Sequence, residues 1–166
     1  MVSFKFELLK PQDVDKCITA LISIPIVDLP GATVETRKMA LRSIIHGSHA
    51  LTLVAKKGNE IVGVINCTRS LGGGIPPRIS FLSIMDEQSA QEGLGQELIG
   101  ELLEVARKEM PSAVYINVSA QAESMWQVAL YSSKGFKVCG FARDVLLQDR
   151  DVVFMKKALR QQRDNK

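Results

Sequence analysis

Two glycines, two residues apart at the start of an apolar helix pattern, are the most specific chemical feature of the sequence. They lie in the segment Gln91-Glu92-Gly93-Leu94-Gly95-Gln96, which follows a strand-like run. Glycine lets the backbone turn tightly and approach a ligand, and the free N–H groups of a helix N-terminus favour phosphate oxygens. The segment therefore predicts a pyrophosphate cradle. The alternative is a turn whose glycines have a steric role only, and the anionic side chain of Glu92 favours that alternative.

The common nucleotide-binding motifs do not fit this segment. A dinucleotide fingerprint needs a third glycine where Leu98 stands, and a Walker loop needs a Gly-Lys-Ser/Thr sequence that is absent. NAD and ATP are therefore not indicated as ligands.

A tyrosine near the end of a later helix pattern is the second feature. Tyr131 is followed by Gly135, which fits the left-handed residue that closes a helix. A phenol has a reference pKa of about 10, so it stays neutral near pH 7 and can donate a proton to a leaving thiolate. Tyr131 is thus a candidate general acid. The alternative is a core tyrosine whose hydroxyl is hydrogen-bonded.

Together these segments resemble the two signature motifs of the GNAT superfamily of acetyltransferases. The first motif is the run from Ala90 to Gly95 that opens a helix, and the second is Ala129-Leu130-Tyr131-x-x-Lys134-Gly135-Phe136. The resemblance covers nearly the whole chain. It implies an N-acetyltransferase that moves an acetyl group from acetyl-CoA to a primary amine by direct attack in a ternary complex, without a metal and with Tyr131 as general acid.

The resemblance also implies how the cofactor is held. A V-shaped opening between the fourth and fifth strands would take the pantetheine, and a backbone N–H near Met85 would meet the oxyanion. The amides from Gln91 to Gln96 would hold the pyrophosphate. The cofactor-binding residues expected on this basis are Ile84, Met85, Asp86, Gln91, Glu92, Gly93, Leu94, Gly95, Gln96, Ser124 and Tyr131.

Three positions depart from the family pattern. The usual basic or Gln residue is Ala90, the Asn seven positions before the Tyr is Ser124, and the Pro after the fourth strand is Glu87. Backbone amides can bind phosphate without side-chain help, so these changes weaken cofactor binding more than they abolish it. They leave open an acyl-CoA sensor or a catalytically degenerate relative, and, with less support, an interaction module without a cofactor.

A general base is not evident. No carboxylate lies in the middle of the strand from Ile79 to Ile84, and Asp86 and Glu87 stand at its end, where capping or exposure is at least as common a role. Asn117 or Ser119 is expected instead to hold a water that relays the proton. Asn117 is therefore the second candidate catalytic residue.

Hydrophobic periodicity predicts the elements that position these residues. They indicate the α/β (α+β) class, a mixed sheet flanked by about four helices. The GNAT-like fold that the resemblance implies has a mostly antiparallel central sheet. The polar, Gly-containing segment 56–60 indicates a hairpin. Strands are expected at residues 4–9, 51–55, 61–67, 78–85, 114–119, 136–143 and 152–156, and helices at residues 14–22, 33–47, 94–110 and 122–130.

Composition fits one soluble domain over residues 1–166, with 157–166 as a frayed basic tail. The chain is 46% hydrophobic and 23% charged, and its net charge of +3 is too small and dispersed to indicate nucleic-acid binding. It lacks a membrane-spanning apolar run and a signal peptide, so we expect a cytoplasmic protein without a membrane partner. The sequence does not decide between a small-molecule amine and a peptide N-terminus as acceptor, nor whether the chain forms a homodimer.

The cysteines and histidines do not indicate a metal site. Cys17, Cys67 and Cys139 lack any paired spacing and are expected to be buried, reduced thiols. His46 and His49 are too few without nearby acidic or thiol partners.

Overall fold

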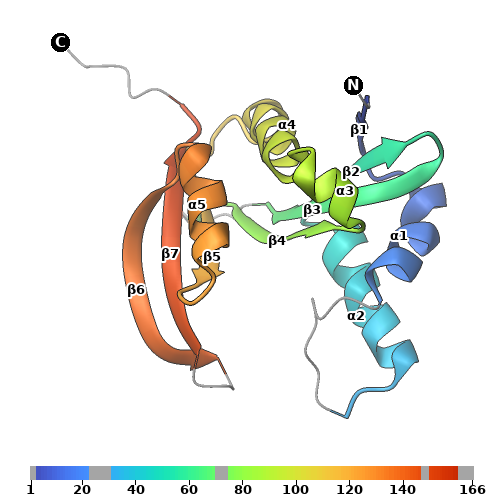
Figure 1. Ribbon diagram of the computed structural model, residues 1–166, viewed down its shortest axis with the longest axis horizontal. Helices are drawn as coiled ribbons and strands as arrows, with labels where there is room; N and C mark the ends of the chain where they lie inside the picture. Colours follow the sequence, from blue (N-terminus) through green and yellow to red (C-terminus); the bar gives the residue numbers. More distant parts are fainter. Residues whose placement is uncertain (1–2, 23–30, 70–74, 147–149, 161–166) are drawn as a thin grey trace.

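A seven-stranded sheet runs through the computed structural model, which describes residues 3–22, 31–69, 75–146 and 150–160. The strand order is β1-β2-β3-β4-β5-β7-β6 (Figure 1). Neighbouring strands are antiparallel except β4 and β5, which are parallel. The strands are β1 Lys5–Leu8, β2 Ala50–Lys57, β3 Glu60–Thr68, β4 Arg78–Ile84, β5 Tyr115–Gln121, β6 Lys137–Leu146 and β7 Arg150–Ala158.

Five α-helices lie on the two faces of this sheet in the described part of the chain. α1 and α2 pack together, mainly against β2 and β3, while α4 crosses the opposite face beside α5 (Figure 1). The mixed, mostly antiparallel sheet is as expected, with one helix more than the sequence indicates. The helices are α1 Val14–Leu21, α2 Val34–His46, α3 Glu87–Gln91, α4 Leu94–Glu109 and α5 Met125–Ser133, and a short 3-10 turn, η1, covers Pro11–Asp13.

α4 shows how the sequence periodicity builds the larger core. Leu94, Leu98, Leu102 and Ala106 follow one another at intervals of four residues, and all are buried against the sheet. Burying one such leucine contributes about 1.5–3 kcal/mol relative to leaving it exposed. The helix ends before Pro111, as expected, because proline cannot continue the hydrogen-bond ladder.

The expectation that β4 leads directly into the glycine turn is wrong, because α3 lies between them. This helix has only five residues and buries only Ser89, so it leaves no apolar period in the sequence. It begins at Asp86, whose carboxylate accepts a hydrogen bond from the Ser89 N–H at 2.8 Å.

Two expectations about surface residues are also wrong. Lys157 and Ala158 belong to β7 and Leu159 is buried, so the basic tail starts later than residue 157, and residues 161–166 lie outside the described chain. Cys139 is exposed at a bulge of β6. Cys17 and Cys67 are buried as expected, and burial raises the pKa of both thiols to about 12. None of the described helices is long and apolar enough to cross a membrane.

Close packing of β3 on α4 fixes the position of the helix start. A Cβ added to Gly63 of β3 would lie 2.8 Å from Leu98 Cδ1 and 3.0 Å from Leu94 Cδ2. Both leucines are fully buried, so neither can swing away. Gly63 therefore lets the first two turns of α4 lie directly on β3.

Gly63→Ala should lower the free energy of unfolding by about 1–3 kcal/mol, because the extra methyl overpacks this contact. Gly95→Ala is the matched control, since its Cβ would meet Leu130 and Leu82 at ordinary distances of 3.6 and 3.7 Å. Alanine has the higher helix propensity, so this control should raise stability by up to about 1 kcal/mol. Urea denaturation followed by circular dichroism measures both values. Equal stability of the two variants would contradict the packing argument.

A network of charges ties β1 and η1 to β2. Lys56 Nζ lies 2.7 Å from Glu7 Oε1 and 2.8 Å from Asp13 Oδ2, and Lys5 also contacts the Glu7 carboxylate at 3.1 Å. The hydrogen bonds from Lys56 and Lys5 lower the pKa of Glu7 from 4.5 to about 2. The folded state therefore favours the ionised carboxylate of Glu7.

Glu7→Gln should lower stability at pH 7 and flatten the acid dependence of stability. With a folded pKa of about 2 and an unfolded value near 4.5, Glu7 stabilises the fold fully above pH 4.5, and this is lost as the pH falls toward 2. The control is Glu35→Gln, which removes an exposed pair with Lys38. Urea midpoints between pH 7 and pH 2 test this, and an acid slope that is the same in wild type and Glu7→Gln would contradict it.

Candidate functional site

The parallel strands β4 and β5 are paired over only two residues. Arg78 is in register with Asn117 and Ile79 with Val118, and no further pair follows although both strands continue in the described chain. The N–H of Asn117 also donates to Pro77 O at 2.9 Å. β4 from Ser80 onward is thus paired with β3 on one edge only, and the other edge borders an opening in the middle of the sheet.

A β-bulge marks the point where the strands part. On β3, the consecutive residues Asn66 and Cys67 pair with Phe81 and Ile79, so Ser80 is an extra residue in β4. A bulge bends its strand and increases the local twist. The bend begins directly after Ile79, the last residue of β4 that pairs with β5, which explains why the two strands separate there.

The hydrogen-bond pattern of β4 decides which backbone groups face the opening. The Met85 N–H donates to Val62 O of β3 at 2.9 Å. Because backbone groups alternate between the two edges of a strand, those of Leu82 and Ile84 point away from β3. The backbone groups of Ile84 therefore face the opening. The expectation for Met85 is corrected, because its N–H is engaged by β3 and is not available for an oxyanion.

The carboxylates at the end of β4 are engaged in α3. Asp86 is its N-cap, and the bond from the Ser89 N–H lowers the pKa of this carboxylate. Glu87 Oε1 accepts from Gln91 Nε2 at 3.2 Å, and Gln88 Nε2 donates to Glu92 Oε1 at 3.0 Å. Capping and helix-surface pairs thus account for these acidic side chains.

The glycine turn between α3 and α4 has a left-handed backbone at Gly93. Its φ is +86°, and nothing lies within 4 Å of where a Cβ would be, so the turn needs glycine for its conformation and leaves open space beside it. The N–H groups of Glu92 and Gly93 donate to Gln88 O and Ala90 O, and that of Gln96 donates to Gly93 O at 2.9 Å. Three of the six amides expected to face a phosphate are thus used within the turn.

The first residues of α4 supply two of the other three donors, since Gln91 is the last residue of α3. Leu94 and Gly95 open the helix, and N–H groups of a first turn have no acceptor within their own helix. Gly95 lies between Leu82 of β4 and Leu130 of α5, since a Cβ added to it would be 3.7 and 3.6 Å from these two side chains. The glycine turn, the free edge of β4 and the tyrosine helix therefore meet at one place.

Tyr131 lies in the last turn of α5 and is only 6% exposed. It belongs to the same apolar cluster as Leu94, with Leu82 and Ile84 packed against that cluster, and its ring meets Phe136 edge-on at 5.5 Å. Burial raises the pKa of Tyr131 to about 12. The phenol is therefore protonated at any physiological pH.

Tyr131 stands near the C-terminal end of α5, which a glycine closes. Gly135 has φ of +80°, and the Phe136 N–H donates to Tyr131 O at 3.1 Å, so the helix closes with a left-handed glycine as expected. Ser124 is the N-cap residue, and its side chain makes no capping bond. Tyr131 is seven positions after Ser124, so the two lie on one side of α5, about 10 Å apart along its axis.

Asn117 does not lie in the cluster that holds Tyr131. Its neighbours Ile116 and Val118 are buried there, so alternation along β5 turns Asn117 and Ser119 to the opposite face of the sheet. Ser119 Oγ accepts from Arg78 Nη2 at 2.6 Å. The structure thus brings Tyr131 together with the glycine turn, but it separates both of them from Asn117.

Sequence reasoning missed Arg78 and the bulge at Ser80. The bulge has a signal, because the apolar positions of β4 shift from Ile79 to Phe81-Leu82 and then to Ile84, which breaks strict alternation. Arg78 has no such signal, since only the strand register shows that it stands beside the opening.

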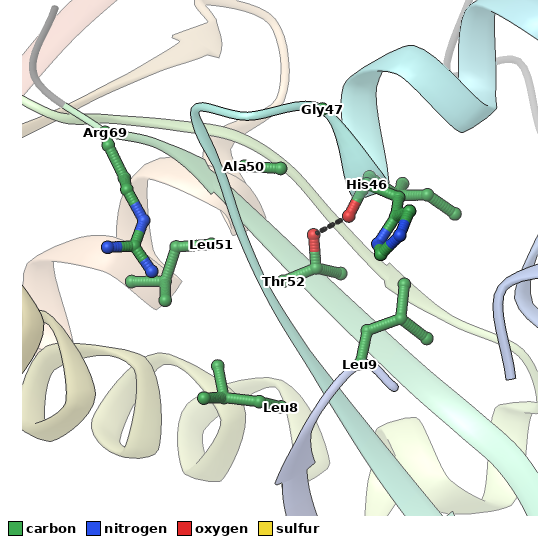
Figure 2. A pocket seen from close by; sticks show the side chains of 9 residues that line it. Leu8, Leu9, His46, Gly47, Ala50, Leu51, Thr52 and Arg69 are labelled. Atoms are coloured by element: carbon green, nitrogen blue, oxygen red, sulfur yellow. Dashed lines mark hydrogen bonds between the residues drawn. The ribbon is translucent and has the colours of Figure 1, made fainter. Parts of the chain in front are cut away.

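A hollow of about 250 Å³ lies elsewhere, between β1, β2 and the end of α2. Arg69 and His46 flank it on opposite sides, and the Thr52 hydroxyl between them donates to Ile45 O at 2.6 Å (Figure 2). It shares no lining residue with β4, α4 or α5. Within the described segments, no group of three or more His, Cys, Asp or Glu side chains is arranged to bind a metal.

Solved structures of acetyltransferases have this fold. An acetyltransferase of the GNAT family from Streptococcus pneumoniae is 21% identical, with a TM-score of 0.74 and coverage of 94% of this chain and 99% of the other. The ribosomal-protein-S18-alanine N-acetyltransferase of Escherichia coli is 14% identical, with a TM-score of 0.75 and 99% coverage of both chains. NAA60 of Arabidopsis thaliana in complex with acetyl-CoA is 14% identical, with a TM-score of 0.75, and 94% of this chain and 98% of that one are covered.

Family membership rests on a match to the sequence itself. No curated protein matches the chain. The model of the acetyltransferase (GNAT) domain, in contrast, matches residues 31–149, which include β4, the glycine turn and Tyr131. The opening between β4 and β5, the turn before α4 and the sequence match agree, and the chain belongs to the GNAT acetyltransferase family.

Proposed function

We propose that this protein transfers an acetyl group from acetyl-CoA to a primary amine, by direct attack within a ternary complex. The observation that carries the proposal is the parting of β4 and β5 after two paired residues. Backbone groups of Leu82 and Ile84 face the resulting opening, with the glycine turn and Tyr131 on the same side of the sheet. Polar backbone in an apolar slot suits a ligand that combines amides with an alkyl chain.

Acetyl-CoA supplies a reactive thioester, and several groups of this chain fit its parts. The pantetheine amides would pair with the N–H and C=O of Leu82 and with the C=O of Ile84, on the free edge of β4, in the manner of an added strand. The N–H groups of Leu94 and Gly95, at the positive end of a 16-residue helix, would face the pyrophosphate, with Gly93 leaving room for it. The acetyl-CoA complex of the similarly folded Arabidopsis NAA60 supports this choice of cofactor. In this proposal Ser124 and the remaining turn residues Gln91, Glu92 and Gln96 would also lie beside the cofactor.

The proposed reaction uses Tyr131 as general acid. A neutral amine would attack the thioester carbonyl, with the Ile84 N–H placed to stabilise the oxyanion, and the C–S bond would break as Tyr131 protonates the thiolate. The proton that the attacking nitrogen loses on forming the amide would then restore the phenol of Tyr131. A pKa of about 12 keeps the phenol protonated. It also makes the phenol a weaker acid than a free thiol, so the transfer depends on the sulfur being desolvated in the same apolar cluster.

The ammonium of the acceptor must lose its proton before the attack. We propose that water carries this proton away. β4 contains no carboxylate, and Asp86 and Glu87, which follow it, are engaged in α3. Asn117 would hold such a water on the face of the sheet opposite Tyr131. In this arrangement the amine and the thioester approach the opening from opposite faces.

Gly93→Glu should raise the dissociation constant for acetyl-CoA about tenfold or more, because it places a carboxylate beside the phosphates. Gly31→Glu is the matched control: Gly31 also has a positive φ, +76°, and nothing within 4 Å, but it lies just before α2 on the other face. Both variants bear the same backbone strain of about 1–2 kcal/mol. Calorimetric titration measures the affinities, and equal losses in the two variants would argue against the cradle.

Tyr131→Phe should lower kcat roughly 10²- to 10⁴-fold at pH 7.5 with little change in acetyl-CoA affinity, because only the proton donor is lost. Tyr115→Phe, on the opposite face, is the control and should keep full activity. Since the pKa of Tyr131 is about 12, wild-type kcat should not decline between pH 8 and pH 10 through loss of its proton. Stopped assays of free CoA over this pH range test both points. Unaltered turnover in Tyr131→Phe would remove Tyr131 from the mechanism, and acetyl-CoA binding without turnover of any amine would indicate a sensor.

A further inference from the structure

A row of cationic side chains crosses the sheet at the point where β4 and β5 part. Arg78 of β4 is in register with Asn117 of β5, Asn117 with Lys156 of β7, and Lys156 with Lys137 of β6. Directly opposed residues of neighbouring strands point to the same face. Arg78, Lys156 and Lys137 therefore form one line, with Asn117 between the first two.

This basic row lies on the face opposite α4 and α5. The next residues along three of the strands, Ile79, Val118 and Met155, are buried in the cluster beneath α4, so their neighbours in the row point the other way. α1 and α2 share this other face but pack mainly on β2 and β3, away from β6 and β7 (Figure 1). All three cations are exposed.

The three cations have no carboxylate partner within the described residues. None of the ion pairs of the described residues includes a cation of the row. Arg78 donates a hydrogen bond to Ser119 Oγ at 2.6 Å, and the Lys156 ammonium lies 5.2 Å from the centre of the Tyr115 ring. Adjacent Lys157, on the other face, donates to Lys134 O at the end of α5. Lys157 therefore has a structural partner and Lys156 has none of opposite charge.

The row opposes two lysines directly, and like charges in that position destabilise a sheet. The stability of the fold thus does not explain why these cations stand in one row. Arg78, held by one bond to Ser119, keeps four of its five N–H donors for a planar anion such as a carboxylate. An anionic ligand on this face would relieve the repulsion.

We infer that the basic row binds an acidic segment of the acceptor, a peptide whose N-terminal amine enters the opening between β4 and β5. This inference rests on the proposed acetyl transfer. Three strand spacings separate Arg78 from Lys137, a span of about 14 Å, which matches about four residues of extended chain. A peptide with carboxylates in the residues after its amine therefore fits the row better than a single amino acid, which would reach one cation only.

The test compares acceptor peptides of equal length with a free N-terminal alanine. One carries Asp and Glu at positions two to five, the other carries Asn and Gln there, and neither contains lysine. The enzyme is wild type, a Lys137→Gln/Lys156→Gln double variant, and Arg78→Gln. A Lys16→Gln/Lys108→Gln double variant is the matched control, because it removes two exposed lysines of α1 and α4 that form no ion pair in the described chain.

We expect wild type to acetylate the acidic peptide with the higher kcat/KM. Each lost cation should lower this value roughly two- to fivefold, while the neutral peptide and the acetyl-CoA affinity stay unchanged. The control variant should behave as wild type. Equal kcat/KM for the two peptides in wild type, or a preference that survives in the double variant, would overturn the inference. So would free glutamate as an equally good acceptor, or stronger competition by a single-stranded oligonucleotide than by the acidic peptide.

A binding measurement separates this inference from the proposed reaction. Fluorescence anisotropy of the acidic peptide with an acetylated N-terminus reports the row without any turnover. If acetyl-CoA does not bind and no amine is acetylated, the proposed function fails, yet peptide binding that is lost in Lys137→Gln/Lys156→Gln still supports the row. Absence of peptide binding, or binding unchanged in that variant, would contradict the proposal that the basic row binds an acidic peptide, whether or not the protein is active.

Discussion

The separation of β4 from β5 is the constraint on which the rest of the structure depends. Backbone N–H and C=O groups need partners, and a strand inside a sheet normally finds them on both edges. After Ile79, β4 keeps only its β3 partner, because the extra residue Ser80 bends it away. The outward groups of Leu82 and Ile84 are therefore available to water or to a ligand with amides, in the middle of the molecule and not at a sheet edge.

The helices are arranged around this opening by small residues. Gly63 lets α4 lie close to β3, which brings the N-terminus of α4 over the end of β4. Gly95, in the first turn of α4, lets Leu82 and Leu130 pack against the helix. α5 then buries one large side chain, that of Tyr131, and the glycine after its last turn leads the chain into β6. The glycine turn and Tyr131 thus depend on the same packing contact between α4, α5 and β4.

Much of this site could be predicted from the sequence, because its signals are local. The glycine turn, the closing Gly135, the order of the elements and the apolar face of α4 follow from spacings within a few residues. α3 could not be predicted, because it begins at the Asp86 cap and has no apolar residues at helical spacing. The direction of the Met85 N–H, the position of Arg78 beside Asn117 and the line of Arg78, Lys156 and Lys137 depend on strand register between segments up to 78 residues apart in the sequence, as from Arg78 to Lys156.

The same register gives the two faces of the opening different chemistry. On the α4 face, burial leaves a neutral phenol among leucines, an environment that favours uncharged forms and hence a protonated leaving group. On the other face, exposed cations and the polar side chains of Asn117 and Ser119 are in contact with water, where an ammonium can lose its proton. Neighbouring cations also disfavour the ammonium form of an approaching amine, and so lower its pKa. In the proposed complex the basic row would therefore assist the deprotonation of an acceptor amine beside β4, a strand without carboxylates.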